Sequence, residues 1–282
     1  MLVAALGFAI MGALVKVGAQ KFSSGELVFY RSLFGLLAIW WYIALKKLPL
    51  ATPVLYKQMS RAIVGLISLA LFFYAIAHLP LATAVTLNYT SPLFLAVITP
   101  FFLHEKPKKI LFIALIIGFV GVVLLLKPTL NRADLLAGSL GLLSGLGAAF
   151  AYMHVKQLGK LNEPDWRTVF YFTLISTIGA GLWMVFEHFQ ALVWPDLPVL
   201  LGLGISATIA QLAMTRAYRT GDTLVVAGLA YITVVVASLF GVLWWNEHLN
   251  LSDWTAIGFI ILSGVISIRT TQPTPVEPVD RI

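Results

Sequence analysis

Apolar runs of membrane-spanning length follow one another along this chain of 282 residues, from its first residues to Arg269. A helix needs about 20 consecutive apolar residues to cross the hydrocarbon core of a bilayer. Of the residues, 60% are hydrophobic and 11% are charged, and a water-soluble domain of this size could not bury so much apolar surface. The runs are unbroken and lack the alternating pattern of barrel strands. The sequence therefore predicts an all-α polytopic membrane protein surrounded by the lipid bilayer.

We expect ten transmembrane helices joined by short polar connections. Their predicted ranges, each defined to within a few residues, are 2–20, 26–45, 61–79, 81–103, 109–127, 136–156, 166–187, 198–218, 222–245 and 251–269. The first run starts at Leu2 without a basic leader and contains Lys16, so we interpret it as a span and not as a cleavable signal. Residues 270–282 are rich in Pro and are expected to form a disordered cytoplasmic tail.

Lysine and arginine residues gather on one side of the predicted helices. That side carries Lys46, Lys47, Lys57, Arg61, Lys106, Lys108, Lys109, Lys156, Lys160, Arg167, Arg216, Arg219, Arg269 and Arg281, whereas the other carries Lys21, Lys127 and Arg132. Since loops rich in these residues face the cytoplasm, both termini are predicted to be cytoplasmic. The net charge of +7 is not clustered on one face, so we expect no nucleic-acid partner. The chain has no cysteine, and we expect neither a metal nor a cofactor.

Two segments of the chain resemble each other. When Thr223–Glu247 is aligned with Leu81–Glu105 without a gap, Tyr231 falls on Tyr89 and Glu247 on Glu105. The repeated unit is then five helices long, covering residues 1–127 and 136–269. Because five is odd, the second unit starts from the opposite face of the membrane, which predicts two inverted five-helix repeats. Chance similarity between apolar stretches is the alternative.

The fourth predicted span carries an unusual cluster of polar residues. Thr86, Asn88, Tyr89, Thr90 and Ser91 precede Pro92. Polar groups at membrane depth are costly, so they line a cavity or pair with one another. Pro92 also frees the carbonyl of the residue four positions before it, Asn88, and this acceptor needs a partner. A solute or a neighbouring hydroxyl could supply that partner; we expect Asn88 to line a cavity, and for Tyr89 both interpretations stay open.

Two other predicted spans carry small or polar faces. In span eight, Gly204, Thr208, Gln211 and Thr215 share one helical face, which could contact a solute or a neighbouring helix. In span six, Gly141, Gly145 and Ala148 share one face with Tyr152; small residues at this spacing predict tight helix packing, with Tyr152 as the exception.

Cations and aromatic residues complete the candidate site. Lys16 can extend to the outer headgroups, and Arg31 can pair with Glu26 or with a solute carboxylate. If both cations point inward, they would attract anionic or zwitterionic solutes. Tyr74 and Tyr231 supply aromatic surface, and Tyr231 lies deep in its span.

Several segments are similar to a known family. They are GELVFYRS at 25–32, YAIAHLPLATA at 74–84, the Pro92-Leu93-Phe94 centre of span four and HEK at 104–106. The sequence resembles the EamA-type repeat of the drug/metabolite transporter superfamily. The second repeat departs from the pattern, with Val234 in place of Pro92 and Asp222 in place of Pro80. The resemblance implies ten helices in two inverted halves, a central substrate cavity and export of small metabolites across the bacterial inner membrane.

We therefore expect a monomeric secondary transporter that moves an amino acid or related zwitterion by alternating access. The alternative is a carrier of the same fold for an organic anion or a nucleotide derivative; an enzyme or a channel is disfavoured because no catalytic histidine motif or filter loop is visible. No Asp or Glu falls at a predicted midplane, which favours a facilitator or exchanger over a proton antiporter. The predicted substrate-binding residues are Asn88, Tyr89, Ser91, Tyr74, Tyr152, Gln211, Tyr231, Lys16 and Arg31, and the predicted gating residues are Pro92, Pro100 and Gly228.

Overall fold

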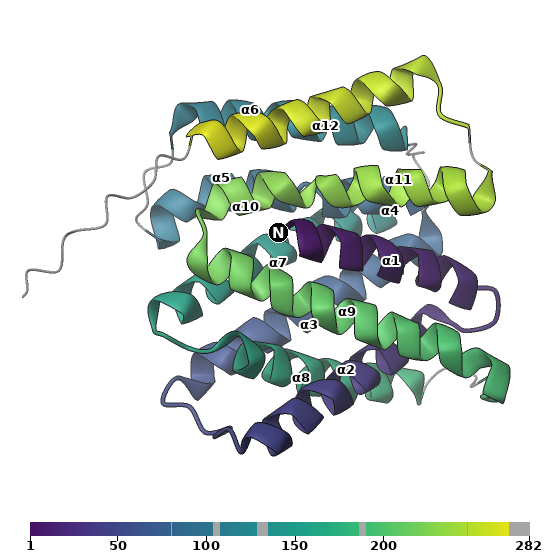
Figure 1. Cartoon of the computed structure of the whole chain (residues 1–282), viewed down its shortest axis with the longest axis vertical. Coiled ribbons are helices and arrows are strands. Elements are labelled where there is room, and N and C mark those ends of the chain that lie inside the picture. Colours follow the sequence, from purple (N-terminus) through teal and green to yellow (C-terminus); the bar gives the residue numbers. More distant parts are fainter. Residues whose placement is uncertain (80, 104–107, 129–134, 186–189, 247, 271–282) are drawn as a thin grey trace, which may run out of the picture.

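The computed structural model describes residues 1–79, 81–103, 108–128, 135–185, 190–246 and 248–270. In these ranges the chain forms helices and no strand, so the all-α prediction is confirmed for them (Figure 1). The helices are α1 (Leu2–Gly18), α2 (Ser24–Lys46), α3 (Leu55–His78), α4 (Leu81–Asn88), α5 (Ser91–Phe102), α6 (Lys109–Leu126), α7 (Leu135–Lys160), α8 (Asp165–Met184), the short 3₁₀ helix η2 (Trp194–Asp196), α9 (Leu197–Thr220), α10 (Thr223–Ala230), α11 (Ile232–Trp245) and α12 (Leu251–Thr270). Glu105, Glu247, Pro80, the HEK segment and the tail after Thr270 lie outside the described residues.

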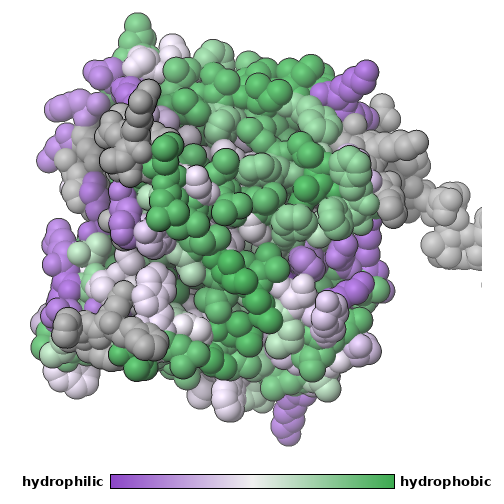
Figure 2. Space-filling view, turned by 180° about the vertical axis from the view of Figure 1, so that it is seen from behind, coloured by the Kyte–Doolittle hydropathy of each residue, from purple (hydrophilic) through white to green (hydrophobic). Residues whose placement is uncertain are grey.

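The surface of the molecule fits a bilayer. Eight segments of the described chain are long and apolar enough to cross a membrane, and α1 is a shorter apolar helix of 17 residues. Large apolar side chains are exposed on their outer faces, including Trp41 at 69% and Phe101 at 73%. Figure 2 shows hydrophobic side chains across the middle of the molecule and hydrophilic ones mainly toward its two ends. Since an exposed apolar belt of this extent suits lipid and not water, the chain is a multi-span membrane protein.

Two of the predicted spans are broken. The fourth is divided into α4 and α5 at Tyr89 and Thr90, and the ninth into α10 and α11 at Tyr231. Pro92, one of the predicted gating residues, lies in the first turn of α5, where a missing backbone N–H costs nothing. The second break contains no proline; at this point the Tyr231 N–H donates to the Gly228 carbonyl at 3.3 Å, in the pattern of a single 3₁₀ turn.

The start of α3 differs most from the prediction. This helix begins at Leu55, six residues before the predicted span 61–79, so Arg61 lies inside the helix and not at its start. Only 2% of Arg61 is exposed, whereas a cation at the end of a span is ordinarily solvated at the membrane surface. The extra helical turns are stabilised by the connection between α7 and α8: Glu163 accepts hydrogen bonds from Thr52 at 2.7 Å and from Gln58 at 2.9 Å.

The helices pack mainly in four pairs. The most extensive contacts join α3 to α7, α1 to α9, α6 to α12 and α2 to α8. In Figure 1, α6 and α12 lie together at one edge of the molecule, and α2 and α8 lie at the other. Glycines bring the first two pairs close: a methyl group on Gly147 of α7 would lie 2.9 Å from Ser68 Cβ of α3, and one on Gly7 of α1 would lie 2.9 Å from Ala210 Cβ of α9.

Polar contacts tie the helix ends together at both surfaces. At one end, which we call the basic end, Lys108 donates to the Thr270 carbonyl at 2.7 Å and Lys156 donates to the Gly221 carbonyl at 2.6 Å. At the opposite end, Lys127 pairs with Asp253 at 2.7 Å. These bonds satisfy carbonyls and charges that the helix ends leave exposed.

Candidate functional site

Four tyrosines meet where the broken helices pass through the centre of the bundle. The rings of Tyr89 and Tyr231, one from each break, lie 6.2 Å apart between centroids. Tyr152 of α7 stacks on Tyr218 of α9, with centroids 4.8 Å apart and planes 10° apart. Tyr218 is also within electrostatic range of Tyr89 and Tyr231. The structure thus brings together three tyrosines that the sequence predicted and adds Tyr218.

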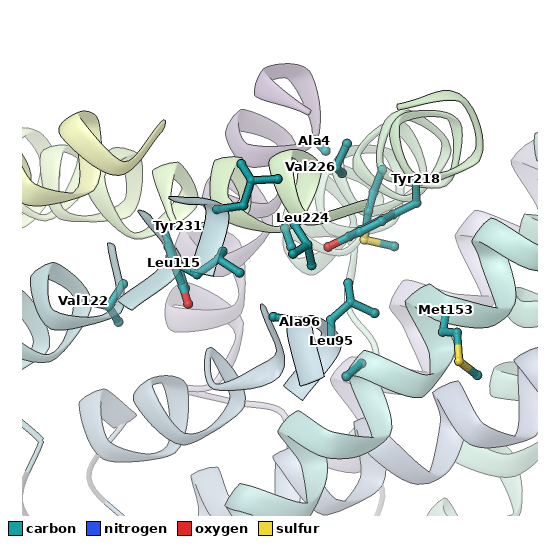
Figure 3. Packing of buried hydrophobic residues seen from close by; sticks show 14 of the residues in the cluster. Ala4, Leu95, Ala96, Leu115, Val122, Met153, Tyr218, Leu224, Val226 and Tyr231 are labelled. Carbon is teal, nitrogen blue, oxygen red and sulfur yellow. The ribbon is translucent and has the colours of Figure 1, made fainter. Parts of the chain in front are cut away.

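This centre contains polar atoms without partners. Tyr218 and Tyr231 are 0% exposed, and Figure 3 shows them among the surrounding apolar side chains. Among the described residues, neither hydroxyl has a hydrogen-bond partner, and the same is true of Gln211 Nε2 and Thr215 Oγ1. Buried polar groups are almost always paired, and more strictly so at membrane depth. An unpaired group at such a place indicates a position for water or a solute.

Two arginines approach the tyrosines from the side of α2 and α3. Arg31 is half-buried and Arg61 is buried. Each guanidinium is within electrostatic range of Tyr152, and the two are within range of each other. The Arg61 guanidinium lies over the Phe172 ring, 4.4 Å from its centroid. Its Nε and Nη1 atoms have no acceptor among the described residues.

A glycine makes room for this arrangement. Any side chain at Gly65, one turn after Arg61, would collide with Arg61 Nη1 and would lie 2.9 Å from the Phe172 ring. The guanidinium therefore lies along α3 toward the C-terminal end of that helix, between α3 and α8.

The carboxylates that the structure describes are engaged elsewhere. Glu26 accepts from the backbone N–H groups of Ser23 and Gln190, both at 2.8 Å, so the expected pair between Arg31 and Glu26 is not formed. The other described carboxylates are bound as follows: Glu163 to Arg167, Thr52 and Gln58, Asp165 to Arg219, Asp196 to Lys21, Asp253 to Lys127, and Asp222 to the first N–H groups of α10. Neither central arginine has a carboxylate partner within the described ranges.

Asn88 lies in the interface between α4 and α7. Its Nδ2 donates to Ser144 Oγ at 3.1 Å, and Ser144 Oγ donates to the Gly141 carbonyl at 2.6 Å. The Asn88 carbonyl that Pro92 leaves free faces Gly145, where a methyl group would lie 3.1 Å away. The packing role predicted for the small residues of span six is therefore confirmed at Gly145.

The polar face of α9 has two parts. Near its start, Thr208 donates to the Gly204 carbonyl at 2.7 Å, and a methyl group on Gly35 of α2 would lie 2.8 Å from Thr208 Oγ1, so this part packs against α2. Further along, Gln211 and Thr215 carry the unpartnered atoms of the polar centre. The helix-contact alternative therefore holds for the first part of this face, and solute contact stays a prediction for Gln211 and Thr215.

The remaining predicted residues have other surroundings. Lys16 is exposed on the last turn of α1, and Tyr74 stacks on His78 within α3 at 4.1 Å. Ser91 is buried at the start of α5, and Pro100 lies inside the same helix. A methyl group on Gly228 would lie 3.1 Å from Ser267 Oγ, which indicates close packing of α10 on α12.

Sequence reasoning missed Arg61, Tyr218 and His154. Tyr218 follows Gln211 by seven residues and so shares its helical face, a spacing that could have identified it. His154 lies six residues before the end of α7 at Lys160, and its imidazole contacts Ser60 Oγ at 3.1 Å and the Phe150 carbonyl at 2.7 Å. In the described part of the chain, no three His, Cys, Asp or Glu residues are grouped to hold a metal ion.

Comparison with known proteins agrees with this architecture. The model of the EamA-like transporter family matches residues 1–127 and again 135–269. The pseudopaline exporter of Pseudomonas aeruginosa strain UCBPP-PA14 is 29% identical over 271 residues, 95% of this chain and 94% of that protein. An uncharacterized transporter of Helicobacter pylori strain J99 is 30% identical, over 94% of this chain and 92% of its own. A riboflavin transporter of Brucella anthropi is 23% identical over 85% of this chain and 89% of its own.

A solved structure shares the fold. It superposes with a TM-score of 0.81 over 96% of this chain and 99% of that chain, at 17% sequence identity. With the family model matching both parts of the sequence, the chain belongs to the EamA-like transporter family.

Proposed function

We propose that this transporter carries a small polar metabolite across the bacterial inner membrane by alternating access. The observation that carries the proposal is the pair of helix breaks at Tyr89 and Tyr231, whose rings meet at 6.2 Å in the polar centre. Broken helices at membrane depth are tolerated where they line a solute path, because backbone groups freed by the break need polar partners. The polar residues around the breaks, including Tyr152, Gln211 and Arg31, would contact the solute.

The proposed architecture is two inverted five-helix units, residues 1–127 and 136–269, which together supply ten spans. Two contacts support it. Gly147 meets Ser68, and Gly7 meets Ala210; the two glycines differ by 140 positions and their partners by 142, so each contact is the counterpart of the other. In the proposed repeat α7 corresponds to α1 and α9 corresponds to α3, so the contact between α3 and α7 is the counterpart of the contact between α9 and α1.

The two broken segments would act as gates on opposite sides of the membrane. In this proposal Pro92 and Pro100 set the path of α4 and α5, and Gly228 lets α10 slide on α12. Tyr74, Ser91, Lys16 and Asn88 stay predicted substrate-binding residues. Conformations of this kind interconvert by rigid movements of packed helices.

We further propose that the basic end faces the cytoplasm, with both termini on that side, and that the protein is a monomer. The relatives include a protein named as an exporter, which supports outward transport. The two substrate classes to be distinguished are an amino acid or related zwitterion, which hydroxyl and amide groups could bind, and an organic anion.

The test is counterflow in proteoliposomes, with a panel of labelled amino acids and organic acids. We expect saturable exchange that falls at least tenfold in Tyr231→Phe, which removes one central hydroxyl, and that is unchanged in Tyr56→Phe, whose side chain is exposed at 84%. Flux that rises linearly with concentration would indicate a channel, and absence of exchange across the panel would refute the proposal.

A further inference from the structure

Among the described residues, no carboxylate is bound to the two arginines of the polar centre. Arg61 is 2% exposed and its Nε and Nη1 lack acceptors, Arg31 lies within electrostatic range of it, and the described carboxylates are bound elsewhere. A guanidinium stays protonated inside a protein, and a buried charge without a counter-ion is strongly unfavourable. Two neighbouring cations add mutual repulsion. A bound anion would relieve both costs.

We propose that Arg61 and Arg31 bind the anionic group of the transported solute, so that the substrate is a small organic anion with carboxylate or phosphate oxygens. The inference rests on the proposed transport function and names its substrate class. The unpartnered Nε and Nη1 atoms of Arg61 lie on different sides of one planar guanidinium, and each can donate a charge-assisted hydrogen bond to an oxygen of such a group.

The other unpartnered groups around the centre are mainly donors or hydroxyls. They include Gln211 Nε2 and the hydroxyls of Tyr218 and Tyr231. An ammonium group, by contrast, would need a carboxylate, and each carboxylate in the described ranges already has a partner. The site therefore favours a solute with net negative charge over a zwitterionic amino acid.

The repeat supplies an internal control for Arg61. Helices α3 and α9 are both 24 residues long and their starts differ by 142 positions, the offset that relates Tyr89 to Tyr231. At this offset Arg61 corresponds to Leu203, which is 0% exposed and packs with Phe22 and Leu27. The same position in the second unit is thus filled by an ordinary apolar residue. The counterpart position packs without a cation, which supports solute binding as the role of Arg61.

Thermal stability of the purified protein tests the assignment. The probes are sodium succinate, glycerol 3-phosphate, the neutral diamide succinamide, inorganic phosphate and sodium chloride at matched ionic strength. We expect succinate or glycerol 3-phosphate to stabilise the protein in a saturable manner, and the stronger of the two identifies the anionic group. Equal stabilisation by succinamide, phosphate or chloride, or stabilisation by none of the probes, would overturn the inference.

Variants locate the effect. Arg61→Gln and Arg31→Gln should each raise the half-saturating anion concentration at least tenfold, whereas Arg216→Gln, which removes an exposed cation of α9, should leave it unchanged. If Arg61→Gln does not fold, Arg61→Lys keeps the charge without the planar fork and should still weaken binding. Unchanged half-saturation in the folded Arg61 and Arg31 variants would refute the assignment.

Counterflow separates this inference from the transport proposal. If labelled glutamine exchanges at the same rate in the native protein and in Arg61→Gln while succinate does not exchange, transport stands and the anion assignment fails. If succinate binds with the expected dependence on Arg61 but no labelled solute exchanges, the anion site stands and the transport proposal fails.

Discussion

Replacing Arg61 by Met should make the ligand-free protein more stable. The Nε and Nη1 atoms lack acceptors, and a buried donor left unpaired costs about 1–3 kcal/mol. Loss of the guanidinium contact with Phe172 costs about 0.5–2 kcal/mol, and a Met sulfur against the same ring returns about 0.3–1.5 kcal/mol. The two unpaired donors together cost about 2–6 kcal/mol, and the central values of the three terms give an expected net gain of about 3–4 kcal/mol in the free energy of unfolding.

The assay is thermal unfolding of purified protein in one detergent, without added organic anions. The expected gain corresponds to a rise in Tm on the order of 5 °C or more. Arg167→Met is the matched control, because Arg167 Nη1 donates to Glu163 at 3.0 Å and Nη2 donates to the Pro49 carbonyl at 2.8 Å. Removing those charged hydrogen bonds should lower stability by about 1–3 kcal/mol.

The test compares the sign of the Tm change in Arg61→Met with that in Arg167→Met. If Arg61→Met lowers Tm as much as Arg167→Met, then Arg61 has a structural partner within the folded chain, and the reasoning about an unbalanced charge is refuted. A rise in Tm together with lost stabilisation by succinate would show that the cation is kept at a cost to stability.

Three further predictions concern packing and pH. Gly147→Leu should destabilise the protein by about 1–3 kcal/mol, since even a methyl group would lie 2.9 Å from Ser68 Cβ; Gly12→Leu, with no neighbour within 4 Å of such a methyl group, should change Tm little. Asn88→Ala should lower Tm by loss of the bond to Ser144, about 0.5–1.5 kcal/mol, and an unchanged Tm would show that this bond contributes nothing. Burial raises the pKa of Glu163, but hydrogen bonds from Thr52, Arg167 and Gln58 outweigh it and hold this pKa below its ordinary value. The ionised form therefore stabilises the fold above the ordinary pKa, and this contribution is lost as pH falls through the lowered pKa; acid should reduce the Tm of the native protein more than that of Glu163→Gln, and equal losses would contradict this.

The helices could be predicted because the bilayer restricts the choice so strongly. A run of apolar residues long enough to cross the hydrocarbon has to satisfy its own backbone, so it becomes a helix whatever its neighbours are. The central tyrosines could be anticipated from the alignment of Tyr231 with Tyr89, because the two positions share one pattern of sequence. Neither inference needed a contact between distant parts of the chain.

The burial of Arg61 could not be predicted for the opposite reason. A cation near the end of an apolar run is ordinarily solvated at the membrane surface. Here α3 continues past it because Gln58 finds Glu163, a residue 105 positions away, and because Gly65 leaves space for the guanidinium over Phe172. The break at Tyr231 could not be predicted either, because no proline marks it.

The proposed repeat also explains how one fold can bind a charged solute in a fixed orientation. Each proposed unit contains one broken helix with a tyrosine at the break, Tyr89 in the first unit and Tyr231 in the second. The two cations occur in the first unit alone: the offset of 142 places Leu203 opposite Arg61 and Thr173 opposite Arg31, and Thr173 donates to carbonyls within its own helix. Symmetric breaks would let the two halves exchange roles as gates, whereas the asymmetric charge would hold the anionic end of the solute against α2 and α3 and leave its other end to the hydroxyls of Tyr218 and Tyr231.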